Sequence, residues 1–287
     1  MGGDKSRAFT IEVEGLEKSY SGRKVLKNIS LYVGAGEKTV IVGPNGSGKT
    51  TLIKCILGLT KCRARRLSIL GSHPRSKSFS KLRRLVGYMP EKVALSSTIK
   101  VEDYLYYLAR IKGCSDYSDE VDLLELRGYL GYNVKSLSQG YKRRVLLAGA
   151  LLCKPRVLIL DEPYSNIDIE TRAVIDSALS QLSWSPTILM ASHVKPGIED
   201  YKMVILVDGE IVGEKRVEGE ICGLKLACKN GEKTIRIQAT SGAGELEELN
   251  SLIKSGECTI SGVFFEGFEQ SLAQILVRAR KQVKTLK

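Results

Sequence analysis

The fold is decided by Gly43-Pro44-Asn45-Gly46-Ser47-Gly48-Lys49-Thr50-Thr51, a glycine-rich stretch in the first third of the chain. A short β-branched run, residues 39–42, leads into it, and apolar residues at helical spacing follow at positions 52, 53, 56 and 57. A strand, a loop of the form G-x-x-x-x-G-K-[ST] and a helix in this order predict a phosphate-binding loop. Its glycines let backbone N–H groups converge on phosphate oxygens, and the amino terminus of the helix adds the positive end of its dipole.

All residues of this stretch are therefore expected to bind a nucleotide. Lys49 should reach the β- and γ-phosphates, and the Thr50 hydroxyl should ligate Mg²⁺. A second signal is Asp161, which ends the apolar run 157–160 and lies 111 residues after Thr50. A carboxylate at the end of a buried strand can hold Mg²⁺ directly or through water. The next residue, Glu162, can accept a proton from an attacking water.

Composition and charge limit the class of protein. The chain has 287 residues, of which 43% are hydrophobic and 26% charged, so we expect one large globular domain or one with a small appendage. The net charge is +12, and residues 38–90 hold twelve Lys or Arg and no Asp or Glu. This stretch suits a polyanionic ligand or an anionic membrane surface, or is a solvated basic face. Aromatic residues are only 6%, and a nucleic-acid partner is not expected.

Cysteines and apolar runs indicate the compartment. No run approaches the ~18 apolar residues of a membrane span, and the amino terminus has no secretory signal. The seven cysteines contain no C-x-x-C pair, and there are only two histidines, which disfavours a zinc cluster and a disulfide framework. We expect a cytosolic protein with reduced thiols, in which Cys55 and Cys153 are small buried apolar side chains.

Short apolar strands alternate with helices, which predicts an α/β fold with a mostly parallel sheet covered on both faces. Alternating polarity in residues 9–13 and 26–33 suggests an additional antiparallel portion. Helices are expected over 102–112, 118–130, 141–152 and 169–182. From about residue 216 the pattern becomes strands at 224–228, 234–239 and 259–265, with helices at 246–254 and 269–283. We therefore expect a nucleotide-binding domain, 1–215, with a helical subdomain at about 92–150, and an accessory α+β domain, 216–287.

Further motifs occur in a fixed order. Leu137-Ser138-Gln139-Gly140-Tyr141 opens a helix, Ser165-Asn166-Ile167-Asp168 follows the two carboxylates, His193 follows an apolar strand, and Tyr20 precedes the phosphate loop. Together with that loop they resemble the nucleotide-binding subunit of ABC (ATP-binding cassette) transporters over about residues 8–215. The resemblance implies a P-loop NTPase with a RecA-like core of mostly parallel sheet, an antiparallel β subdomain and a helical subdomain.

The resemblance also implies roles for these residues. Two such domains would bind head to tail with MgATP between the phosphate loop of one and the family's signature motif, here Leu137-Ser138-Gln139-Gly140-Tyr141, of the other. Ser138, Gln139 and Gly140 would contact the nucleotide across that interface, and Asp168 would couple the two sites. Tyr20 would stack on adenine. Glu162 would be the general base, with Lys49 and His193 acting on the γ-phosphate.

Departures from the family pattern concern three motifs, one of which, Ser165-Asn166-Ile167-Asp168, lacks the family's usual Leu before Asp168. Glu91 stands where the family has a Gln; it can still ligate Mg²⁺, and residues 88–91 resemble the exporter-like branch that handles drugs, lipids and polysaccharides. Gln139 and Tyr141 replace a Gly and a Gln of the signature.

We accordingly expect the energising ATPase of an exporter, at the cytoplasmic face of the membrane. Its partners would be a separately encoded polytopic membrane subunit and a second ATPase subunit, identical or related. Alternatives are a soluble ATPase of this family acting on a non-transport assembly partner, and a nucleotide-binding regulator without useful turnover.

Overall fold

The computed structural model describes residues 9–92, 98–194 and 196–217, and three strands beyond them, 221–228, 231–238 and 258–265. The chain divides into two compact units, Met1–Arg216 and Val217–Lys287. No helix in the described part of the chain is both long and apolar enough to cross a bilayer.

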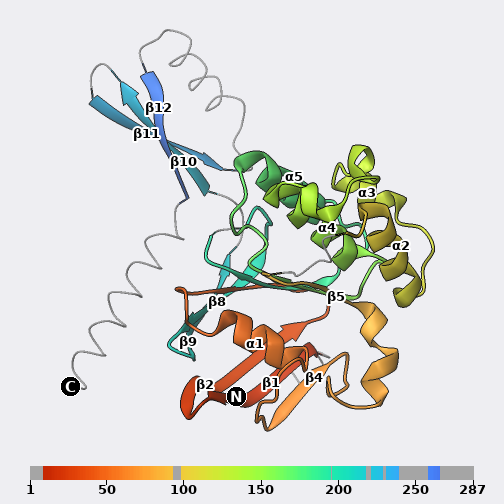
Figure 1. Ribbon diagram of the computed structural model, residues 1–287. Helices are drawn as coiled ribbons and strands as arrows, with labels where there is room; N and C mark the ends of the chain where they lie inside the picture. Colours follow the sequence, from red (N-terminus) through yellow and green to blue (C-terminus); the bar gives the residue numbers. More distant parts are fainter. Residues whose placement is uncertain are drawn as a thin grey trace, which may run out of the picture. The chain divides into compact units, whose positions relative to one another are not determined.

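A six-stranded sheet forms the centre of the first unit (Figure 1). Its order is β5 (Val86–Met89), β6 (Val157–Asp161), β7 (Thr187–Ser192), β3 (Lys38–Val42), β8 (Tyr201–Val207) and β9 (Glu210–Val217). The first five strands run parallel. Strands β6 and β7 are buried along their whole length, because both faces of the sheet are covered. A two-residue turn, Asp208 (φ 48°) and Gly209 (φ 77°), then leads into β9.

An antiparallel sheet of three strands lies beside it, in the order β2 (Arg23–Gly34), β1 (Phe9–Tyr20) and β4 (Arg66–Ile69). Helix α1 (Lys49–Ile56) packs between the two sheets, as Figure 1 shows. Its buried side chains, among them Leu52 and Ile56, join one apolar cluster with residues of both sheets, such as Ile159 and Leu31. The phosphate loop that precedes α1 is therefore anchored by the main core.

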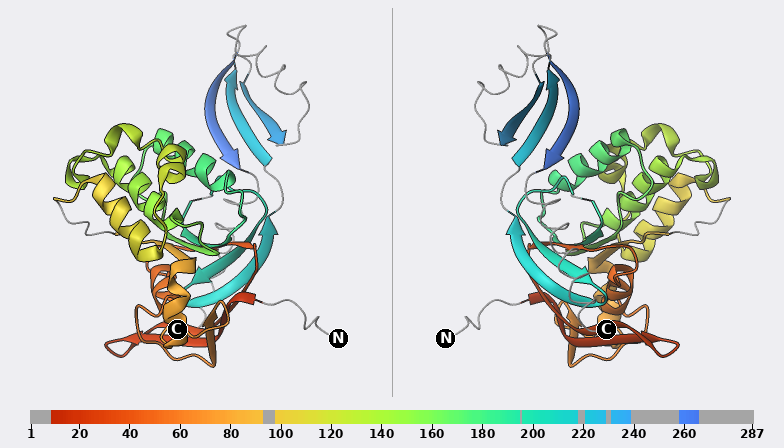
Figure 2. Two further views of the ribbon diagram at one scale, coloured as in Figure 1. Left: turned by 90° about the vertical axis from the view of Figure 1, so that its right-hand side faces the viewer. Right: turned by 90° about the vertical axis from the view of Figure 1, so that its left-hand side faces the viewer.

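The remaining helices are α2 (Val101–Lys112), α3 (Ser118–Leu123), α4 (Gln139–Leu151) and α5 (Ile169–Ser180). Helices α4 and α5 lie on the face of the six-stranded sheet opposite α1, and α2 and α3 pack against α4 (Figures 1 and 2). The described residues of this unit also contain four short 3-10 helices: Ser78–Lys81, Arg83–Leu85, Arg127–Tyr129 and Val134–Ser136. The predicted class, an α/β fold with parallel sheet, antiparallel sheet and helical subdomain, is confirmed.

The helix predicted over 118–130 is wrong beyond its first half. Helix α3 ends at Leu123, and the chain turns at Glu125, whose φ is 53°. Leu124 and Leu126 are both fully buried. Residues two positions apart project to opposite sides of a helix, and the turn lets both of these side chains reach the core.

In the second unit the described strands form one antiparallel sheet, in the order β11 (Gly231–Gln238), β10 (Ile221–Cys228) and β12 (Cys258–Phe265). Strands occur at the three predicted places. The helices predicted over 246–254 and 269–283 lie outside the described residues.

The expectation of reduced thiols is wrong for one pair of cysteines. Cys114, just after α2, and Cys153, just after α4, form a disulfide across 39 residues of sequence. Next to it the Lys112 ammonium donates to the carbonyl oxygens of Gly149 (3.0 Å) and Ala150 (3.1 Å), near the end of α4. Disulfide and ammonium together fasten α2 to α4. Cys55, by contrast, is a free and fully buried thiol as expected.

Replacing Cys114 by Ser should lower the free energy of unfolding by about 2–4 kcal/mol, because the closed loop no longer restricts the unfolded chain. Urea denaturation without reductant measures the difference. With reductant, the parent protein and Cys114→Ser should have the same free energy of unfolding. The control is Cys62→Ser, at a free and partly exposed cysteine. Equal stabilities of Cys114→Ser and the parent protein under oxidising conditions would contradict a stabilising disulfide.

Candidate functional site

The parallel strands end together at one edge of the six-stranded sheet. Val42 of β3 pairs with Ser192 of β7, and Asp161 of β6 pairs with Ala191, next to it. The segments that follow β3, β6 and β7 therefore leave the sheet side by side. This edge, at the carboxyl ends of parallel strands, is where open α/β sheets bind ligands. The register thus brings the phosphate loop, Glu162 and His193 to one place.

The phosphate loop approaches other backbone too closely for ordinary side chains. A Cβ on Gly43 would lie 2.1 Å from the carbonyl oxygen of Leu206 in β8. Gly48, which caps α1, has φ of 107°, a conformation that residues with a side chain rarely adopt. Both glycines are thus required by the local packing, and the loop opens directly onto the amino terminus of α1.

Lys49 folds back over this loop. Its Nζ donates to the carbonyl oxygens of Gly43 (2.9 Å) and Pro44 (3.3 Å) and forms an ion pair with Glu162 Oε1 at 3.2 Å. Both charged side chains are almost fully buried. A buried ion pair is stable only when further hydrogen bonds satisfy its groups, and here the two carbonyls do so on the lysine side.

Glu162 also contacts His193. Its Oε2 lies 2.6 Å from His193 Nδ1 and accepts a hydrogen bond from the His193 backbone N–H at 3.3 Å. One carboxylate therefore joins the lysine of the phosphate loop to the histidine that follows β7. The three residues predicted as catalytic from separate motifs form a single cluster.

Asp161 and Thr50 form the second polar pair. The Thr50 hydroxyl donates to Asp161 Oδ1 at 2.9 Å, and Asp161 is fully buried. Its Oδ2, and the Ser47 hydroxyl oxygen, have no hydrogen-bond partner among the described residues. Burial raises the pKa of Asp161 to about 6, the nearby acids Glu91 and Glu162 add to the rise, and the Thr50 hydrogen bond opposes it.

These residues fit a magnesium ion. An orphaned carboxylate oxygen beside a hydroxyl offers two hard ligands, and Mg²⁺ is usually held by one or two carboxylates with phosphates and water completing the shell. In the described residues no group of three or more His, Cys, Asp or Glu could hold a metal without such help.

A cavity of about 640 Å³ opens over the phosphate loop. Residues from the loop and from the strand ends line it: Tyr20, Val25, Asn45, Gly46, Gly48, Lys49, Thr50, Thr51, Glu91, Glu162, Ser165, Asn166 and His193. Tyr20 is about half exposed at 46%, and Lys18 Nζ lies 4.3 Å from its ring centroid. Val25 was not predicted, since nothing in the sequence marks an apolar residue in β2 as a site residue.

The predicted signature residues Ser138, Gln139 and Gly140 and the predicted Asp168 are not among the residues that line this cavity. Ser138 caps α4, its Oγ accepting from Tyr141 N at 3.3 Å, and Asp168 caps α5, its Oδ1 accepting from Thr171 N at 2.7 Å. A Cβ on Gly140 would meet the Thr171 hydroxyl at 2.3 Å, so the starts of α4 and α5 pack tightly together.

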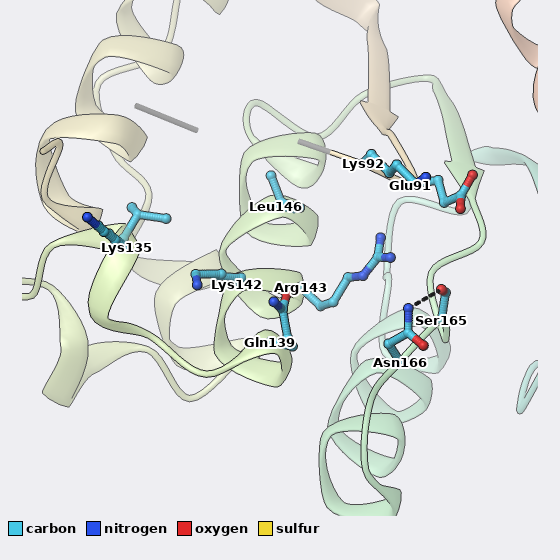
Figure 3. Close-up of a pocket in the computed structure, with 10 residues that line it drawn as sticks. Glu91, Lys92, Lys135, Gln139, Lys142, Arg143, Leu146, Ser165 and Asn166 are labelled. Atoms are coloured by element: carbon cyan, nitrogen blue, oxygen red, sulfur yellow. Dashed lines mark hydrogen bonds between the residues drawn. The ribbon is translucent and has the colours of Figure 1, made fainter. Parts of the chain in front are cut away.

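Figure 3 shows a second hollow, of about 660 Å³, beside the first. Gln139 and Arg143 of α4 line it, and Glu91, Ser165 and Asn166 line both hollows. Arg143 extends from α4 toward Glu91 (Figure 3), and its Nη1 donates to the Pro90 carbonyl oxygen at 3.3 Å. Burial lowers the pKa of Arg143, while Glu91, Asp161 and Glu162 act in the opposite direction. The sequence alone did not predict that Arg143 would be a positive charge near these acids; its only signal in the sequence is a basic residue one turn into α4.

Comparisons with known proteins agree with this geometry. The family model described as ABC transporter matches residues 26–165. The chain is 30% identical to the uncharacterized ABC transporter ATP-binding protein YxlF of Bacillus subtilis, over 88% of this chain and 76% of that protein. It is 35% identical to the zinc import ATP-binding protein ZnuC of Pseudomonas savastanoi pv. phaseolicola (64% and 66% covered). It is 33% identical to the Nod factor export ATP-binding protein I of Rhizobium leguminosarum bv. viciae (72% and 69%).

Solved structures show the same fold. The ATP-binding subunit of an ABC transporter superposes with a TM-score of 0.64 at 28% identity, covering 72% of this chain and 90% of that one. A bacterial ABC transporter cassette solved as a dimer gives 0.65 at 23% identity, with 73% and 99% covered. The chain belongs to the ATP-binding proteins of ABC transporters, P-loop ATPases that bind and hydrolyse ATP.

Replacing Asp161 by Asn should stabilise the nucleotide-free protein near neutral pH. The carboxyl has a pKa of about 6 when folded and an ordinary value of 3.8, so the folded state loses stability as the pH rises from 3.8 to 6, and the full loss persists above pH 6. The gain in unfolding free energy should reach up to about 3 kcal/mol at pH 7.5 and shrink to about 1 kcal/mol at pH 4.5.

Denaturant unfolding at the two pH values measures the gain, and Asp119→Asn, at an exposed carboxylate, is the control. If Asp161→Asn were less stable than the parent protein at pH 7.5, burial of the ionised Asp161 carboxylate would not be unfavourable, contrary to this prediction.

Proposed function

We propose that this chain energises an exporter by hydrolysing MgATP, with Glu162 as the general base. The observation that carries the proposal is the contact of one buried carboxylate with Lys49 Nζ (3.2 Å) and His193 Nδ1 (2.6 Å) beside the phosphate loop. A carboxylate held there can orient a water against the γ-phosphate and take its proton. His193 stabilises the carboxylate and the attacked phosphate.

Phosphate binding rests on the loop from Gly43 to Thr51 and on the amino terminus of α1. Lys49 exchanges its carbonyl partners for phosphate oxygens and neutralises the charge that develops on them. Asp161, Thr50 and Glu91 would hold Mg²⁺, which when bound supplies further neutralisation of the phosphate oxygens. Tyr20 offers a ring for the base of the nucleotide, worth about 1–3 kcal/mol in stacking.

Ser138, Gln139, Gly140 and Asp168 act on the nucleotide of a second ATPase subunit, identical or related. This proposal is supported by their position outside the cavity that holds Lys49 and by the dimeric cassette among the structural relatives. The exposed amino terminus of α4 gives the signature N–H groups that can face a γ-phosphate brought by the partner.

A separately encoded polytopic membrane subunit would complete the transporter and place this chain at the cytoplasmic face of the membrane. Subunits of this family work with membrane subunits. Among relatives, names for zinc import and for Nod factor export both occur, so their names leave the direction open. Residues 88–91, which resemble the exporter-like branch, favour export.

Replacing Glu162 by Gln should lower ATP turnover by at least about 100-fold, because an amide cannot accept the proton of the attacking water. Equilibrium binding of ATP should change little, and size-exclusion chromatography with ATP should show a dimer. Glu170→Gln, at an exposed position on α5, is the matched control. Unchanged turnover in Glu162→Gln would refute the assignment of the base.

Lys49→Ala should lose ATP binding itself, since the side chain that neutralises the phosphates is removed. Fluorescence titration with an ATP analogue measures the dissociation constant. An unaltered dissociation constant would contradict the assignment of residues 43–51 as the phosphate-binding loop.

Expressed from its own genomic neighbourhood, the chain should co-purify with a protein of several hydrophobic spans in detergent. Recovery only with soluble partners would instead support the alternative, an ATPase acting on a non-transport assembly.

A further inference from the structure

A single carboxylate outside the nucleotide cavity joins the two segments that carry Glu162 and His193. Asp176, in the middle of α5, accepts hydrogen bonds on Oδ1 from the Tyr164 hydroxyl at 2.6 Å and from the Gly197 N–H at 3.1 Å. Tyr164 is two residues after Glu162, and Gly197 is four residues after His193. The chain segments leaving β6 and β7 are therefore tied to one oxygen atom.

The backbone and side chains around Asp176 pack closely against it. A Cβ on Gly197 would lie 2.4 Å from both Cγ and Oδ2 of Asp176, so the approach of this backbone requires glycine. Tyr164 is buried, and Arg172 Nε reaches Asp176 Oδ2 at 3.6 Å from the preceding turn of α5. Burial and the neighbouring Asp176 keep the pKa of Tyr164 well above its ordinary value, so its hydroxyl remains a donor at any physiological pH.

Glu162 needs such an anchor. Its φ is 50°, a left-handed conformation that is uncommon for a residue with a side chain and persists only where neighbouring contacts enforce it. Its backbone N–H is fixed to the Ala191 carbonyl oxygen at 2.9 Å. The next residue, Pro163, has no backbone N–H and cannot donate a hydrogen bond. The residue after it, Tyr164, fixes this segment through its hydroxyl, which donates to Asp176.

The segment of His193 is fixed on both sides in a similar way. Before it, the Ser192 hydroxyl donates to the Val194 carbonyl oxygen at 2.7 Å, and after it the Gly197 N–H is bound to Asp176. The His193 side chain itself is about half exposed, at 46%. Packing therefore does not enclose the ring, and its 2.6 Å contact with Glu162 depends on where the two backbone segments place the two side chains.

We propose that Asp176 and Tyr164 are positioning residues, which hold the Glu162 carboxylate and the His193 ring in contact for catalysis. The proposal rests on the function proposed above for these two side chains. Neither Asp176 nor Tyr164 lines the nucleotide cavity in the described residues, so they act through the backbone and leave ATP binding to the phosphate loop.

The test compares Tyr164→Phe, which removes one hydroxyl, with Asp176→Leu and Asp176→Asn. The leucine removes the acceptor at similar volume, whereas the asparagine keeps an acceptor oxygen. In Tyr164→Phe and Asp176→Leu, kcat should fall about 10- to 100-fold while KM for ATP changes less than about twofold. Asp176→Asn, which keeps the acceptor oxygen, should have a kcat within about threefold of that of the parent protein. Ser180→Ala, at the exposed end of the same helix, is the control.

A spectroscopic reading separates positioning from loss of fold. The chain has only two histidines, His73 and His193, so the imidazole region of its NMR spectrum has two assignable sets of signals. Tyr164→Phe and Asp176→Leu should shift the His193 signals and leave those of His73 unchanged. All assays are run below the unfolding temperature of each variant; if Asp176→Leu does not fold, Tyr164→Phe decides alone.

Unchanged kcat in Tyr164→Phe, or a lower kcat with His193 signals identical to those of the parent protein, would overturn the proposal. A parallel rise in KM would do the same, because it would show a change in nucleotide binding. Failure of the proposed function is a different result: Glu162→Gln would then retain turnover, whereas the shift of the His193 signals in Tyr164→Phe would still be seen.

Discussion

The Glu162 carboxylate lies between the ammonium group of Lys49 and the ring of His193, and this contact joins the phosphate loop to the segments that follow β6 and β7. It exists because β3, β6 and β7 end in register at one edge of the sheet. A one-residue slip of β6 would turn Glu162 away from Lys49 and bring Asp161 out of the core. The long apolar strands, which fix the register by burial on both faces, are thus a condition of the chemistry.

The site places charge where the fold does not favour it. Asp161 is fully buried, and one of its oxygens has no partner among the described residues; Lys49 and Glu162 are buried as a pair; and the charge of Arg143 is buried with Glu91, Asp161 and Glu162 raising its pKa against that burial. Glu162 also adopts a left-handed backbone conformation. Strain and buried charge of this kind concentrate at sites whose ligands or reactions use them. The surrounding apolar cluster of α1 and the two sheets supplies the stability that permits it.

Helix α5 links the parts of this arrangement. Its first turn packs against Gly140 at the start of α4 through Thr171, and Asp176, further along, holds the segments that follow Glu162 and His193. Helix α4 is in turn fastened to α2 by the Cys114–Cys153 disulfide and by Lys112. The signature at the start of α4 is therefore connected through rigid elements to the residues that contact the phosphate loop.

The sequence by itself determined the α/β class, the phosphate loop and the two carboxylates at the end of β6. Each of these is marked by neighbouring residues in the chain: by the spacing of apolar residues, or by glycines that allow an unusual backbone conformation. Residues 43–51 predict their own structure, since glycine spacing and the flanking strand and helix are contiguous in the chain. Only the tertiary structure decided which distant groups meet: Cys114 with Cys153, Arg143 with the carbonyl oxygen of Pro90, and Asp176 with Tyr164 and Gly197. The reason is physical. Such contacts depend on helix packing and strand order, which place residues tens of positions apart within a few ångströms without leaving a periodic trace in the sequence.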